Sequence, residues 1–146
     1  MSYCAQADLA RMLPESVLIR LTDDASAGSI DAEKIAEAID TASDEIDAYI
    51  GGRYALPIAG TAPPILAKLC ADIAIYNLYS RVKEQAPELR SERYKAAIKL
   101  LEAIASGKIS LGVQPPPSPP AAGGYEGGAQ VSVRDKIFDS TTMDKY

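Results

Sequence analysis

Apolar and polar positions follow a helical period through much of the chain, and the clearest case lies between Ser29 and Gly52. Apolar residues there recur at spacings of four, three, four and three, which places them on one face of an α-helix. They are Ile35, Ile39, Ala42, Ile46 and Tyr49, and the opposite face carries Glu33, Glu37, Asp40, Asp44 and Asp47. Ser29 or Asp31 is expected to cap the start of this helix, and Gly51-Gly52 to stop it.

A second helix, predicted over residues 65–82, is apolar nearly all round. Thr61 is expected to cap it, with Pro63-Pro64 in its first turn. A helix without a polar face belongs in the centre of a bundle, or between its own core and a neighbouring subunit.

Three further helices complete the predicted bundle. Two short ones are expected over residues 5–13 and 15–21, with Pro14 in the first turn of the second. The last opens at Pro87 and ends at Gly107. Its expected buried stripe is Tyr94, Ala97, Ile98, Leu101, Ile104 and Ala105. The prediction is an all-α domain of about five helices over residues 1–111.

Composition changes abruptly after this domain. Residues 112–128 contain five prolines and five glycines, which indicates an extended linker rather than a packed element. Residues 129–146 are expected to form a docking arm, with a short β segment around Val131 and Val133. Ile137 and Phe138 have nothing nearby in the sequence to pack against, so we expect the arm to bind a partner. The expected docking residues are Val131, Val133, Arg134, Ile137 and Phe138.

Little in the sequence indicates catalysis. The chain has no histidine, the commonest general base and metal ligand, and no nucleophile motif or phosphate-binding glycine loop. We therefore expect no enzymatic activity, no cofactor and no metal. Cys70 is expected to be a small buried hydrophobe and Cys4 an exposed free thiol. No secretory signal or membrane-spanning run is apparent, which predicts synthesis in a cytoplasm.

Charge is distributed unevenly along the chain. Residues 1–50 sum to −8 and residues 51–110 to +4, within a total of −5. Such a division suits head-to-tail association of identical subunits, although the opposite charges could also pair within one domain. The carboxylates Glu37, Asp40, Asp44 and Asp47 fit a solvated helix face, a subunit interface or, least well, a cation site.

A basic cluster lies across the junction of the last two helices. It consists of Arg81, Lys83, Arg90, Arg93, Lys95 and Lys99. A DNA-binding surface is one interpretation, but interspersed glutamates and the net negative charge favour pairing with an acidic helix face.

The order of several short strings resembles a known family. They are Asp47-Ala48-Tyr49-Ile50-Gly51-Gly52-Arg53-Tyr54, Leu56-Pro57, Pro63-Pro64, Ala71–Tyr79, Arg93–Ala97 and Leu100–Gly107. Over residues 3–112 the chain is similar to the Mu-like phage branch of the head–tail connector, or adaptor, proteins. Members of this branch often carry no assigned function, and the family has no known catalytic residues to transfer.

The resemblance implies a virion protein that forms a ring, commonly twelvefold, between portal and tail. Expected partners are copies of itself, the portal protein and a tail-side neck or tail-terminator protein. Viral DNA would pass through the channel without sequence-specific contact, and no membrane is involved. We expect Asp40, Asp44 and Asp47 to face Arg90, Arg93 and Lys99 across subunits. The alternatives are a tail-completion or stopper protein and, in a different class, a small DNA-binding regulatory protein.

Overall fold

The computed structural model describes residues 2–82 and 85–113, and within them the protein is all-α, as predicted. It contains five helices and no strand in this part of the chain. They are α1 (Gln6–Met12), α2 (Glu15–Thr22), α3 (Ala32–Ile50), α4 (Pro64–Arg81) and α5 (Glu88–Ala105). From residue 114 onward, the linker predicted over residues 112–128 and the docking arm predicted over residues 129–146, with its suggested β segment, lie outside the described residues.

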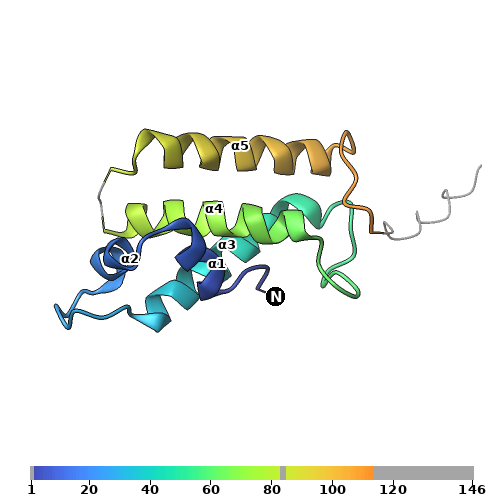
Figure 1. The fold of residues 1–146 in the computed structure, drawn as a ribbon. Helices are drawn as coiled ribbons and strands as arrows, with labels where there is room; N and C mark the ends of the chain where they lie inside the picture. The colour runs from blue at the N-terminus through green and yellow to red at the C-terminus, as the bar shows by residue number, and fades with distance from the viewer. Residues whose placement is uncertain (1, 83–84, 114–146) are drawn as a thin grey trace, which may run out of the picture. The chain divides into compact units, whose positions relative to one another are not determined.

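Helix α4 is the centre of the bundle. It lies between α5 on one side and the N-terminal helices on the other, and α3 crosses behind it (Figure 1). Ten of its eighteen residues are buried, including Leu66, Ile73 and Leu78. The nearly continuous apolar character of this segment therefore reflects burial on several sides.

Helix starts combine one confirmed prediction with one correction. Asp31 caps α3, because its carboxylate accepts hydrogen bonds from the backbone N–H groups of Glu33 and Lys34. Thr61 does not cap α4. Pro63 occupies the N-cap position and Pro64 is the first helical residue. Thr61 is therefore two residues too early for its hydroxyl to reach the free N–H groups of the first turn.

Prolines also precede α2 and α5. Pro14, Pro63 and Pro87 each stand directly before the first helical residue, with backbone φ between −51° and −58°. Their carbonyls accept hydrogen bonds from N–H groups of the third or fourth residue of the helix that follows. A proline here loses no needed donor, since its ring nitrogen would have had no helical partner.

The segment before α1 is buried, which corrects the prediction for Cys4. Tyr3 and Cys4 both belong to the core, and the Cys4 Sγ lies 2.9 Å from the Cys70 Sγ. The Tyr3 backbone N–H donates to the Ser43 hydroxyl on α3 at 3.2 Å. The helical pattern did not reveal this because the segment lies outside any helix and packs through long-range contacts.

Candidate assembly surfaces

The acidic face of α3 carries the first group of predicted interface residues. Glu37, Asp40 and Asp44 are exposed, and Asp47 is half-buried. The Ser2 hydroxyl donates to Asp40 at 2.8 Å, and the Tyr3 hydroxyl donates to Asp47. Burial, together with this bond to Asp47, raises the pKa of Tyr3 above its ordinary value. Two of the three predicted aspartates therefore already have partners within the subunit.

Basic residues near the α4–α5 junction also have internal partners. Arg81 binds both carboxylate oxygens of Asp24, at 2.7 and 2.9 Å, and the Leu21 carbonyl at 2.6 Å. This bidentate contact raises the pKa of Arg81 and lowers that of Asp24. Arg81 thereby ties the end of α4 to the end of α2 and to the loop that follows it.

Arg90 and Arg93 hold α5 to the rest of the bundle. The Arg90 guanidinium donates to the Met12 carbonyl at the end of α1, at 2.5 Å. Arg93 lies 3.6 Å from a carboxylate oxygen of Asp72, which is buried on α4. Placing a positive charge beside this carboxylate offsets part of the cost of its burial.

Only Asp44 and Lys99, of the six predicted interface residues, are exposed and have no polar partner among the described residues. Asp44 belongs to the acidic face of α3, and Lys99 lies on the outer side of α5 next to the exposed Lys95. Contact between these residues across subunits stays a prediction.

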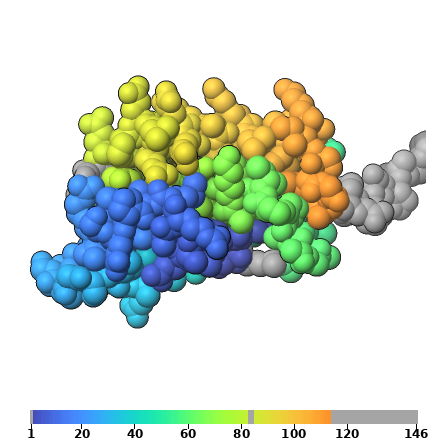
Figure 2. Space-filling model, in the orientation of Figure 1, coloured from blue at the N-terminus to red at the C-terminus, as the bar shows by residue number. Residues whose placement is uncertain are grey.

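Helix α5 presents a broad surface on one side of the bundle. Figure 2 shows its side chains, in yellow to orange, along the upper face of that view. Only Ala97, Leu101 and Ile104 are buried, and Leu89 is 59% exposed. Tyr94, Ile98 and Ala105, which were also predicted for the buried stripe, are half-buried. Most of α5 is therefore accessible to a partner.

Tyr94 joins α5 to both α4 and α3. Its ring stacks on Tyr76 with 4.2 Å between centroids, and its hydroxyl donates to Glu45 at 3.0 Å. Burial and the bond to Glu45 raise the pKa of Tyr94 to about 12. This polar contact fixes how α3 and α5 approach one another.

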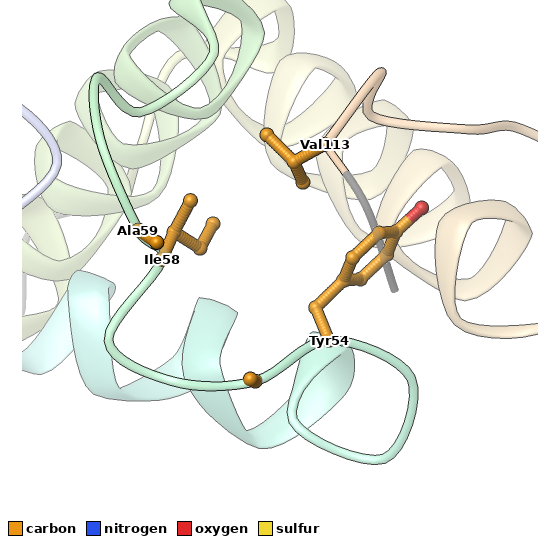
Figure 3. Close-up of a pocket in the computed structure, with 5 residues that line it drawn as sticks. Tyr54, Ile58, Ala59 and Val113 are labelled. Atoms are coloured by element: carbon orange, nitrogen blue, oxygen red, sulfur yellow. The ribbon is translucent and has the colours of Figure 1, made fainter. Parts of the chain in front are cut away.

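A hollow of about 310 Å³ lies beside the point where the chain leaves the bundle. Tyr54, Ile58, Ala59 and Val113 face this hollow in Figure 3, and Ala55 completes its lining. The Tyr54 hydroxyl accepts a hydrogen bond from the Leu111 backbone N–H at 3.1 Å, which lowers the pKa of Tyr54. The chain after α5 is thus anchored on the loop after α3.

Arg53 reinforces this anchor. Its guanidinium lies 5.9 Å from the centroid of the Tyr54 ring and covers Gly107, directly after α5. The sequence interpretation did not assign a role to Arg53, Tyr54 or Leu111. The sequence did contain one signal, because the loop is unusually apolar for a segment bracketed by glycines. Two of its apolar residues, Tyr54 and Ile58, are buried in the structure.

The described part of the chain contains no group of three or more histidine, cysteine or acidic residues arranged to hold a metal ion. Within the same residues no helix combines the length and apolarity needed to span a bilayer. The predicted docking residues Val131, Val133, Arg134, Ile137 and Phe138 lie outside the described residues.

These features describe a small all-α protein with charged outer faces, whose chain after α5 is anchored on the loop after α3. The chain belongs to the family described as Bacteriophage Mu, Gp36, whose model matches residues 3–127. The match confirms the resemblance to Mu-like phage proteins.

Two phage or prophage proteins are similar to this chain in sequence. The Mu-like prophage FluMu protein gp36 of Haemophilus influenzae is 38% identical over 111 residues, which is 76% of each chain. Gene product J of Escherichia phage Mu is 29% identical over 115 residues, covering 78% of this chain and 79% of the phage protein.

Proposed function

We propose that this protein is a non-catalytic structural subunit of a tailed-phage particle that assembles into a ring between head and tail. Membership of a Mu phage family supports an assembly role in a phage. The described residues offer charged surfaces on α3 and α5 and an exposed apolar side chain, Leu89, on α5. Such surfaces suit association with other proteins.

The observation that carries the proposal is the placement of unlike charge on two separate helices. Helix α3 contains six acidic residues and one lysine, whereas α5 contains four basic and three acidic residues. Asp44 and Lys99 remain exposed on these helices after the internal pairs are formed. A subunit whose two unlike surfaces are complementary associates head-to-tail, and a closed head-to-tail assembly is a ring.

The same charge distribution bears on the passage of DNA. Carboxylates that line a channel repel the phosphate backbone and let DNA slide without specific contact. The α3 carboxylates that meet α5 of a neighbouring subunit are not free for this role. We therefore assign Asp44, which has no partner within the described part of the subunit, to the subunit contact.

A measurement of molar mass by light scattering tests the ring, first at low salt and then at high salt. Asp44→Lys and Lys99→Asp should each shift the protein toward the monomer, and the double variant should recover assembly because the pair is restored with reversed sign. Glu15→Lys and Lys108→Asp change charge equally at exposed positions elsewhere and serve as controls. A monomer at all concentrations and salt conditions would reject the ring.

Location in the particle requires a second experiment. We propose that the segment from residue 112 onward, with Ile137 and Phe138 as apolar anchors, binds the portal protein, and that the opposite side of the ring meets a tail-side neck or tail-terminator protein. Deletion of residues 114–146 should abolish capture by purified portal protein and leave helices α1–α5 folded. Binding to tail tube but not portal would instead indicate a tail-completion protein.

A further inference from the structure

The two cysteines of the chain meet inside the bundle. Cys4 precedes α1 and Cys70 lies in the middle of α4, yet their sulfur atoms are only 2.9 Å apart. Cys70 is fully buried, and Cys4 is 9% exposed. Nothing in their sequence spacing indicates this contact, and the ring proposal makes no use of it.

We propose that Cys4 and Cys70 are a cross-linking site, which closes into an intramolecular disulfide when the protein meets an oxidising environment. A disulfide bond is about 2.05 Å long, so the sulfur atoms need to approach by only about 0.9 Å. Both side chains already point at one another from segments that are packed together. A bond between two separate molecules is disfavoured because burial shields both thiols.

The surroundings of Cys70 favour its thiolate form. The hydrogen bond from the Cys4 thiol, together with the contact to the Ser43 hydroxyl at 3.5 Å, lowers the pKa of Cys70 although burial opposes this effect. The same bond to Cys70, together with burial, raises the pKa of Cys4. Cys70 is therefore the nucleophile of the pair, and its thiolate attacks sulfur more readily than a thiol does.

The reaction needs an oxidant, and the class proposed is a low-molecular-weight disulfide such as oxidised glutathione. Cys4 reacts when the segment before α1 opens away from Cys70, because its pKa is then no longer raised by burial and by the bond to Cys70. Its thiolate attacks the small disulfide, forming a mixed disulfide and releasing one small thiol. The Cys70 thiolate then attacks the Cys4 sulfur, and the second small thiol leaves. Two protein thiols are oxidised, one small disulfide is reduced to two thiols, and the two protons end on those thiols.

Closure would fix the segment that covers the acidic face of α3. Next to Cys4, the Tyr3 N–H bonds Ser43 and the Tyr3 hydroxyl bonds Asp47, while Ser2 bonds Asp40. A covalent bond at Cys4 prevents these residues from leaving α3. It also restricts the unfolded chain, so the oxidised protein should melt higher by on the order of 10 °C.

Mass spectrometry of the full-length protein tests the cross-link directly. The protein is incubated with oxidised or with reduced glutathione, denatured, alkylated with iodoacetamide and weighed intact. We expect two alkyl groups on the protein after the reducing treatment. After the oxidising treatment we expect none, and a protein mass lower by two hydrogens than that of the reduced, unalkylated chain. Digestion without reductant should then yield one linked species that contains both cysteines.

Thermal melting with matched variants tests the consequence. The wild type should melt higher after oxidation, whereas Cys4→Ser and Cys70→Ser should melt equally under both treatments. Two alkylatable thiols in the oxidised wild type would overturn the proposal, as would a disulfide-linked dimer or stable glutathione adducts. These readouts use the wild-type chain, so they hold even if a serine variant fails to fold, and they are independent of ring formation.

Discussion

Helices α4 and α5 are equal in length and lie side by side, but they are used in opposite ways. Ten residues of α4 are buried, compared with three of α5. Helix α4 is enclosed by the other helices, whereas α5 contacts the bundle along one stripe and leaves its outer side accessible (Figure 1). Helix α4 therefore specifies the fold, whereas α5 both closes the core and provides surface for association.

The strongest test of this contrast replaces one leucine on each helix. Leu78→Ala removes a fully buried side chain from α4 and should lower the free energy of unfolding by about 2–5 kcal/mol. Leu89→Ala removes an exposed side chain from α5 and should change that free energy by less than about 0.5 kcal/mol. Urea unfolding measures both, and similar losses would contradict the assigned roles.

A smaller effect is expected where α5 ends. Gly107 has φ +80°, and an added Cβ would lie 2.1 Å from a terminal nitrogen of Arg53. Gly107→Ala should cost about 1–2 kcal/mol, from the backbone conformation and from displacement of Arg53.

Gly112→Ala is the matched control for this change. Gly112 also has a positive φ, of +74°, but an added Cβ meets nothing within 4 Å. Its cost should therefore be limited to the backbone conformation, about 1 kcal/mol. If the two variants unfold at the same urea concentration, Arg53 contributes nothing to the anchoring of α5.

The smallest expected effect concerns Tyr94 at alkaline pH. Its folded-state pKa of about 12 exceeds the unfolded value of about 10. The resulting stabilisation is complete below pH 10 and is lost as the pH rises toward 12. Tyr94→Phe should therefore show a shallower loss of stability between pH 9 and 11 than the wild type.

Tyr3→Phe provides a comparison for this measurement. The pKa of Tyr3 is raised as well, by burial and by Asp47, so its replacement should flatten the alkaline profile in the same direction. Denaturant unfolding at a series of pH values measures all three proteins. Identical slopes would exclude ionisation of Tyr94 and Tyr3 as the cause of the alkaline loss.

The pattern of apolar residues predicted the helices because residues three and four apart in the sequence share one face of a helix, and that face is the buried one. It located all five helices within the few residues by which helix ends vary, and one of its two candidate caps for α3, Asp31, is the observed one. It failed for Thr61, where consecutive prolines moved the start of the helix. It also failed for Cys4 and Tyr54, whose burial depends on segments far away in the sequence.

The partners of the charged residues were also hard to predict, because these partners come from segments far away in the sequence. The partners of Asp40, Asp47 and Arg90 are 38, 44 and 78 residues away in sequence. The sequence pattern places these charged side chains on the outer face of a helix. It does not show whether a distant segment or a backbone carbonyl forms a hydrogen bond with them. Only Asp44 and Lys99 kept the free exposure expected of the whole set.

The bond between Leu111 and Tyr54 has a practical consequence for anyone who modifies this protein. Because this bond holds Leu111 on the bundle, a sequence fused after Val113 begins from a fixed point. It should therefore not disturb the packing of the helices. A fluorescent protein or affinity tag fused there should report on assembly without perturbing the bundle. Natural variation in the length of the extension should be tolerated at the same junction.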